Sequence, residues 1–206
     1  MDMTHSEPKT PTRLKAGERR QEILQTLATL LEQPRGEKIT TALLASRLSI
    51  SEAALYRHFA SKAKMFECLI EFIEETLFTR INRISTEIHS GLGQVEAILS
   101  LLLAFADKNP GMTRVLTGEA LLYENERLDA RVNQLCDRLE TSLRQSLRLA
   151  TTHGEITSDR GVSVQANLLM NVVLGRWHQF TASHFRRSPT QDWDILWALL
   201  KPMTRM

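Results

Sequence analysis

The feature that most constrains the fold is the stretch of residues 40–62, whose pattern predicts two very short helices joined by a tight corner. Thr40 precedes an apolar set around Leu44, and Ser51 precedes another around Leu55, so each hydroxyl is placed as a helix N-cap. Helices shorter than ~12 residues are not stable in isolation, so only the packing of these apolar side chains into one small core can hold them. The stretch therefore predicts a helix-turn-helix unit.

Short side chains occupy the first turn of the second helix, at Ser51, Ala53 and Ala54. In a helix-turn-helix unit this turn enters the major groove of DNA, where short side chains let base edges and thymine methyl groups come within contact distance. Side chains that can donate hydrogen bonds to phosphate follow directly, at Tyr56, Arg57, His58 and Lys62. The pattern predicts DNA binding, and the alternative is a generic helical hairpin whose charges are solvated. The candidate DNA-contacting residues are Thr40, Thr41, Ser51, Glu52, Ala53, Ala54, Tyr56, Arg57, His58 and Lys62.

Net charge is informative only when the chain is divided. The whole chain carries +2, but residues 1–64 hold 11 Lys and Arg against 7 Asp and Glu, which gives +4 and leaves −2 for the remainder. Neutralisation of phosphates is the sequence-independent part of DNA affinity. A basic excess beside the helix-turn-helix stretch gives modest support for DNA binding.

The order of patterns along the chain predicts three parts. Residues 1–16 contain Pro8 and Pro11 and few apolar residues, so we expect a disordered basic tail. Residues 17–63 are expected to form the helix-turn-helix DNA-binding domain, and residues 64–206 a C-terminal domain for dimerisation and partner binding. The tail is either a DNA-contacting arm or merely solubilising, and its candidate contact residues are Lys9, Arg13, Lys15, Arg19 and Arg20.

Helical spacing of apolar residues continues through the C-terminal part, so an all-α protein is expected. Ser61 is placed as the N-cap of a long helix over residues 62–89, which Gly91 and Gly93 are expected to stop. Further helices are predicted over residues 95–106, 112–122, about 128–153 and 162–185, with a last one after Pro189. A helix that reaches from the DNA-binding part into the body would link the two.

One flank of the long helix carries an aromatic ring beside arginines. At ~100° per residue, Phe72 points away from the apolar stripe and falls near Thr76, Arg80 and Arg83. Exposed Phe and Arg are enriched at protein contacts, so this flank is a candidate partner-binding surface. The alternative is that Phe72 packs on the first helix or under a neighbouring loop.

Aromatic residues gather in the last two predicted helices, which favours these helices as the contact between two copies of the chain. Helix pairs that meet their own copy form an isologous four-helix bundle. The alternative is that the rings fill an intramolecular core. The candidate dimer residues are Trp177, Phe180, Phe185, Trp193 and Trp197.

Other functional classes find little support in the sequence. We identify no Ser-His-Asp order, phosphate-cradling glycine loop or metal-ligand spacing, so neither an enzyme nor a cofactor or metal is expected. No apolar run approaches the ~18 residues that span a bilayer, so cytoplasmic location is expected. Cys68 and Cys136 are expected to be buried structural thiols.

Several of the residues above resemble the signature of the TetR family of DNA-binding regulators. The matching positions are Thr40, Thr41, Ala45, Ile50, Ser51, Leu55, Tyr56, His58, Phe59 and Lys62. The resemblance implies a three-helix DNA-binding domain, a helical body and dimers whose two reading helices meet a pseudo-palindromic site. Ser49 departs from the signature, because glycine is usual at that corner and adopts the turn geometry at lower cost.

From the second helix of the helix-turn-helix stretch onward, the chain looks like the nucleoid occlusion factors within that family. The matching positions are residues 51–59, 65–66, 69–74, 79–82, 109–111, 116–118 and 133–135, with Arg131 and Phe185. This resemblance implies a dimer that binds chromosomal sites in the nucleoid and antagonises polymers of the tubulin-like division protein FtsZ. The implied FtsZ-binding residues are Phe72, Thr76, Arg80, Arg83, Leu101, Lys108 and Asn109. The competing function is a TetR-type repressor released by a small molecule bound in the body.

Overall fold

The computed structural model describes residues 16–33, 39–122, 124–156 and 161–203, and the predicted tail lies outside them except for Ala16. The elements are α1 (Ala16–Leu30), α2 (Thr41–Arg47), α3 (Glu52–Tyr56), α4 (Lys62–Glu87), α5 (Gly91–Lys108), α6 (Pro110–Leu116), the 3₁₀ helix η1 (Glu119–Leu121), α7 (Glu126–Thr152), α8 (Val162–Ala182) and α9 (Trp193–Met203). The described residues contain no strand, so the all-α prediction is confirmed.

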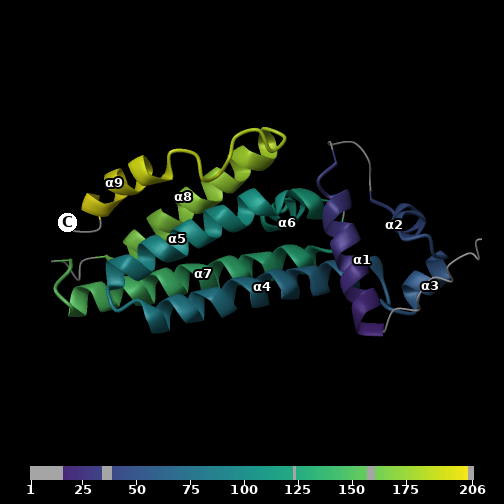
Figure 1. The fold of residues 1–206 in the computed structure, drawn as a ribbon, viewed down its shortest axis with the longest axis horizontal. Helices are drawn as coiled ribbons and strands as arrows, with labels where there is room; N and C mark the ends of the chain where they lie inside the picture. Colours follow the sequence, from purple (N-terminus) through teal and green to yellow (C-terminus); the bar gives the residue numbers. More distant parts are fainter. Residues whose placement is uncertain (1–15, 34–38, 123, 157–160, 204–206) are drawn as a thin grey trace, which may run out of the picture.

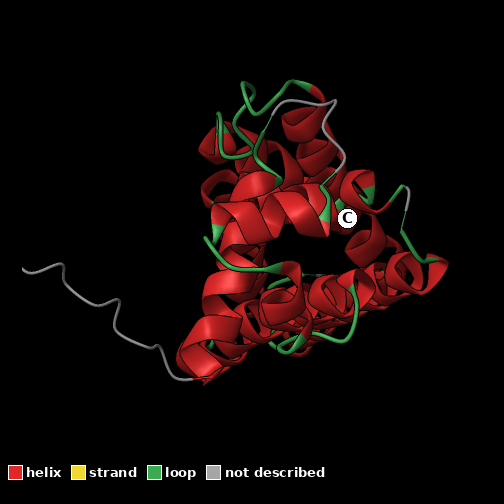
Figure 2. Ribbon diagram, turned by 90° about the vertical axis from the view of Figure 1, so that its right-hand side faces the viewer, coloured by secondary structure: helices red, strands yellow, loops and turns green. Residues whose placement is uncertain are grey.

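The long helices lie side by side and form the body of the molecule. α7 packs against α4, α5 and α8, and α5 packs against α4 and α8 (Figure 1). α1 crosses one end of this bundle, and α2 and α3 lie beyond α1 at the far right of Figure 1. Figure 2 views the molecule from this end and shows helices joined by loops. We call α1, α2 and α3 the head, and α4 to α9 the body.

Hydroxyl caps begin three of the helices, as the sequence predicts. The side chains of Thr40, Ser51 and Ser61 accept hydrogen bonds from the backbone N–H groups of Leu43, Ala54 and Lys64, each at 3.1 Å. Each cap satisfies one of the N–H groups that a helix start leaves without an intrahelical acceptor. The caps fix where α2, α3 and α4 begin.

The α4–α5 corner differs from the sequence prediction. α4 ends at Glu87, and Gly91, expected to stop that helix, lies instead in the first turn of α5 behind the N-cap Ser90. A Cβ on Gly91 would lie 2.2 Å from the backbone nitrogen of Ala150 in α7. The glycine therefore serves a close approach between helices.

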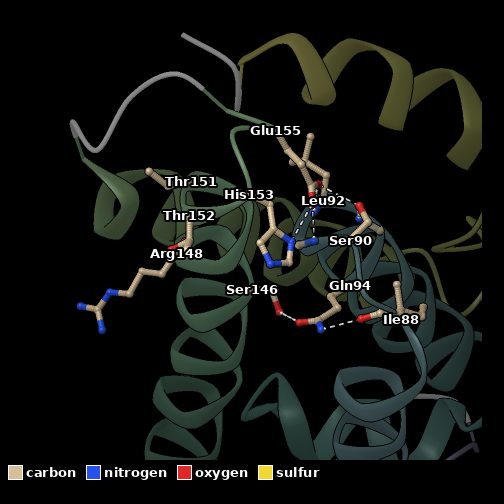
Figure 3. A network of polar contacts seen from close by, with 12 residues as sticks. Ile88, Ser90, Leu92, Gln94, Ser146, Arg148, Thr151, Thr152, His153 and Glu155 are labelled. Atoms are coloured by element: carbon tan, nitrogen blue, oxygen red, sulfur yellow. Dashed lines mark hydrogen bonds and ion pairs between the residues drawn. The ribbon is translucent and has the colours of Figure 1, made fainter.

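A carboxylate from the turn that follows α7 closes this corner (Figure 3). Glu155 accepts hydrogen bonds from the N–H groups of Gly91 and Leu92, at 2.8 and 2.9 Å, and from the hydroxyl of Ser90. Partial burial raises the pKa of Glu155, but these hydrogen bonds and the neighbouring His153 outweigh it and leave the pKa lowered. A charged Glu155 thus joins the end of α7 to the start of α5.

The rings assigned to a dimer contact largely belong to the protomer's own core. Trp177 is fully buried, and its Nε1–H donates to the carbonyl of Leu102 in α5 at 3.2 Å. Phe180 and Trp197 are also buried, whereas Phe185 and Trp193 are half-buried. The assignment of Trp177, Phe180 and Trp197 as contact residues is therefore corrected, because aromatic rings at helical spacing serve a core as readily as an interface.

Both cysteines carry free thiols and are partly buried rather than fully so. Burial, with a smaller contribution from Asp137, raises the pKa of the Cys136 thiol to about 11. The raised pKa disfavours the thiolate, which is the reactive form, at neutral pH. None of the helices in the described part of the chain has the length and apolar character that crossing a bilayer requires.

Candidate nucleic-acid interface

The helix-turn-helix corner forms as the sequence predicts. α2 ends at Arg47, and the N–H of Ile50 donates to the carbonyl of Ala45 at 3.0 Å, which closes the turn. Ser49 sits in the left-handed region at φ 53°. Leu44 and Leu55 are buried and hold the two short helices against the core of the head.

Replacing Ser49 with glycine should stabilise the protein. The left-handed conformation costs an L-residue about 1 kcal/mol that glycine does not incur. For a chain of this length, a gain of ~1 kcal/mol corresponds to a Tm increase of about 2–4 °C. Ser46→Gly, at an exposed right-handed position in α2, is the matched control and should lower the Tm. A thermal melt in which Ser49→Gly also lowers the Tm would contradict this account of the corner.

The first turn of α3 faces solvent. Ser51, Glu52 and Ala53 are exposed, and Ala54 is half-buried. α3 packs on α2 and lies at the outer end of the head, away from the body (Figure 1). A duplex can therefore approach this turn.

A polar chain crosses from α3 to α2 on the same side. The Tyr56 hydroxyl, in a side chain that is 46% exposed, lies 3.5 Å from the Thr41 hydroxyl, which donates to the Glu52 carboxylate at 2.6 Å. Thr40 and Arg57 are exposed, and His58 is half-buried. Nine of the ten predicted DNA-contacting residues thus lie on or beside α2 and α3, and their contacts with DNA stay predictions.

Lys62 departs from the predicted set. Its ammonium forms an ion pair with the carboxylate of Glu124, in the connection between η1 and α7, and lies 5.7 Å from the centre of the Phe66 ring. Both charged side chains are largely buried. The pair braces the start of α4 against the body, so the structure does not present Lys62 to a phosphate. Glu124 carries no local sequence signal, because it follows Lys62 by more than 60 residues.

Arg20, considered as a DNA contact of the tail, lies on the surface of the head and contacts the chain after α3. Its guanidinium donates to the carbonyl of His58 at 3.1 Å and lies 4.6 Å from the centre of the Phe59 ring. Arg20 belongs to α1 and steadies the chain just after α3. Arg20 is exposed, so its contact with DNA stays a prediction beside this structural role.

The candidate partner surface begins with Phe72, whose ring is 40% exposed on α4. The ring is therefore not packed away under α1 or a loop. Arg80 and Arg83 are exposed, Arg83 pairs with Glu87 at 2.8 Å, and Thr76 is half-buried.

Two of the three other residues assigned to this surface, Lys108 and Asn109, lie at the end of α5 that is nearest the head. α4 runs away from the head and α5 returns antiparallel to it, so Lys108 and Asn109 end α5 near the head. Lys108 is exposed, and Leu101 and Asn109 are half-buried. The Asn109 side chain donates to the carbonyl of Phe105 at 2.7 Å. Their binding role stays a prediction.

The opposite side of α4 is fixed to α7. The Glu74 carboxylate, in a residue that is 8% exposed, pairs with Arg131 at 2.5 Å and with Arg138. The Arg138 guanidinium also stacks over the Phe78 ring at 4.2 Å. These contacts hold α4 in one orientation, so Phe72 is presented from a rigid helix.

Two family models match the chain. Residues 24–69 match the family described as bacterial regulatory proteins, tetR family, and residues 89–204 match the tetracyclin repressor-like C-terminal domain of SlmA-like proteins. The first range contains the whole helix-turn-helix unit, and the second contains most of the body.

Solved structures share the fold at low sequence identity. A TetR-family transcriptional regulator from Agrobacterium tumefaciens superposes with a TM-score of 0.73 at 18% identity, over 92% of this chain and 97% of that one. The ketosteroid transcriptional regulator KstR2 of Mycobacterium tuberculosis gives 0.72 at 16% identity, over 90% and 94%. At these identities the likeness supports the TetR fold alone.

Curated relatives are much more similar in sequence. The chain is 50% identical over 190 residues to the nucleoid occlusion factor SlmA of Alteromonas mediterranea, covering 92% of this chain and 97% of the relative. It is 51% identical over 187 residues to SlmA of Vibrio cholerae, covering 88% and 93%. This chain therefore belongs to the TetR family of DNA-binding regulators and, within it, to the SlmA nucleoid occlusion factors.

Proposed function

We propose that two copies of this chain bind pseudo-palindromic chromosomal sites through α3 and, from there, antagonise FtsZ polymers over the nucleoid. In this proposal residues 17–63 are the DNA-binding domain and residues 64–206 carry the dimer and partner surfaces. The observation that carries the DNA part is the exposed first turn of α3, with Ser51 and Ala53 open to a base edge. Exposed Arg57 and half-buried His58 follow as phosphate donors.

The dimer is proposed to form through aliphatic side chains on α8 and α9. Val164 and Leu168 are exposed on α8, and Ile195 and Leu199, one helical turn apart, are each 66% exposed on α9. Large apolar groups exposed in adjacent elements mark interaction sites. We propose that a second copy of the chain covers these side chains, because a two-fold symmetric dimer also matches a pseudo-palindromic DNA site.

The FtsZ surface is proposed to centre on Phe72 and Arg80. Phe72 is 40% exposed, and Arg80, further along the same flank of α4, is also exposed. An exposed aromatic ring and guanidinium on one flank have the composition of an interface centre. The rigid seating of α4 through Glu74 favours a surface that is already formed before the partner arrives.

The test compares FtsZ polymerisation with the protein alone, with the protein and a specific DNA site, and with Phe72→Ala or Arg80→Asp and the same DNA. We expect DNA-bound wild type to reduce polymer. Each variant should require an about tenfold or higher concentration for the same effect, since truncation at an interface centre costs ~2 kcal/mol. Arg148→Asp, at an exposed arginine on α7, is the matched control. Equal polymer in every arm would remove the division role and leave a repressor.

A further inference from the structure

A buried guanidinium joins the body to the end of the head's first helix. Arg114 on α6 is 6% exposed, and its Nη1 donates to the carbonyls of Leu31, at 2.8 Å, and Gln33. These carbonyls follow directly after α1, where the last C=O groups of a helix have no intrahelical donor. A cation at this end also interacts favourably with the helix dipole. Arg114 therefore caps α1 from outside the head.

The same guanidinium rests on an aromatic ring from a distant part of the chain. The Cζ of Arg114 lies 4.7 Å from the centre of the Phe185 ring, and the Phe180 ring is 5.1 Å from that of Phe185. Glu119 approaches the Nε of Arg114 at 3.2 Å. Arg114 is thus held between the end of α1 and the turn that joins α8 to α9.

The turn that carries Phe185 has an unusual backbone. His184 and Phe185 are consecutive non-glycine residues in the left-handed region, at φ 52° and 62°. Each such residue costs of order 1 kcal/mol and persists only where the surroundings enforce it. The conformation is closed by the N–H of Phe185 donating to the carbonyl of Phe180 at 2.8 Å. This backbone conformation directs the Phe185 ring toward Arg114.

The neighbouring contact between α6 and α1 is too close to admit a side chain between the two helices. A Cβ on Gly111 would lie 1.9 Å from the carbonyl oxygen of Ala28, so α6 touches the α1 backbone directly. α1 in turn packs against α2. An unbroken series of contacts therefore runs from the α8–α9 turn through Phe185, Arg114 and α1 to the helix-turn-helix unit.

We propose that Arg114, seated on Phe185, is a positioning residue that sets the orientation of the DNA-binding head relative to the dimer-forming helices α8 and α9. This inference rests on the proposed DNA-binding dimer. Two heads must meet half-sites about 34–36 Å apart, so a small rotation of each head at the end of α1 changes whether both can bind together. A lysine keeps the charge of Arg114 but lacks the planar guanidinium that stacks on the Phe185 ring and the Nε–H that faces Glu119.

The experiment measures the affinity of the full-length protein for two duplexes, one with both half-sites of a site recovered from genomic fragments and one with a single half-site. Arg114→Lys and Phe185→Leu should each weaken full-site binding by about tenfold, within the 5- to 150-fold range of couplings between sites. Half-site affinity and the salt dependence should stay unchanged, since the phosphate contacts are the same. The double variant should lose no more full-site affinity than either single variant, because both substitutions act through one contact.

Arg144→Lys, at an arginine paired with Glu140 within α7, is the control and should leave both affinities unchanged. Phe185→Leu keeps the inference testable if Arg114→Lys lowers the Tm enough to leave protein unfolded. Equal losses on the full-site and half-site duplexes, or no loss on either, would overturn the positioning role while the proposed function stands. A wild type that binds neither duplex would overturn the proposed function, and this inference with it.

Discussion

Leu168→Asp combined with Leu199→Asp should convert the protein to a monomer and weaken its binding to a full two-half-site duplex by about 10²- to 10⁴-fold. A charge at each exposed leucine would be buried without a partner at the proposed α8–α9 interface, which is strongly unfavourable. The loss on DNA follows because a linked second head binds at a high effective concentration that the monomer lacks. Sedimentation velocity gives the mass, and a titration with labelled DNA gives the affinity.

The matched control is Leu122→Asp, at a leucine that is 73% exposed outside α8 and α9. It should leave both mass and affinity as in the wild type. If the double variant remains a dimer, the exposed aliphatic groups on α8 and α9 are not the contact, and another surface must carry the two-fold symmetry.

Gly91→Ala should destabilise the body by about 3 kcal/mol or more. The added Cβ would lie 2.2 Å from the backbone nitrogen and 2.6 Å from the Cα of Ala150, and backbone atoms cannot turn aside as the end of a side chain can. Overpacking of this kind costs ~1–3 kcal/mol when neighbours can shift, and more when they cannot. A loss of ~3 kcal/mol lowers the Tm of a chain of this length by about 6–12 °C.

Gly17→Ala is the control for this change. Nothing lies within 4 Å of a Cβ at Gly17, near the start of α1, so the Tm should stay the same or rise slightly. A thermal melt of Gly91→Ala that matches the wild type would mean that α5 and α7 leave room for a Cβ at residue 91.

The parts of the fold that local sequence determines could be predicted. Thr40, Ser51 and Ser61 cap helices because a hydroxyl before an apolar periodic run needs only its next three residues to act. The angular position of Phe72 on a long helix favoured an exposed ring but left packing under the first helix or a loop open, and the structure decides for exposure. The first turn of α3 was predicted to face DNA from its small side chains and its place in the helix-turn-helix unit, and the structure leaves this turn exposed.

The parts that depend on distant partners could not be predicted. Gly91 looked like a helix stop because the backbone of α7 that excludes a Cβ there is almost 60 residues away. Lys62 looked like a phosphate contact because Glu124 is equally remote in sequence. Trp177 satisfied the pattern for a core and for an interface alike, and its complete burial and its hydrogen bond to Leu102 assign it to the core.

The central claim is that the first turn of α3 reads base edges while the flanking donors hold phosphates. The most direct measurement compares the DNA sequences selected from a randomised pool by the wild type, Ala53→Gln and Tyr56→Ala. Glutamine at the exposed Ala53 can reach the N6 and N7 atoms of an adenine, so the preferred base should change at one position in each half-site. Tyr56→Ala should keep the wild-type preference and bind all sequences more weakly. An unchanged preferred sequence for Ala53→Gln would contradict the account, since another element would then be reading the site.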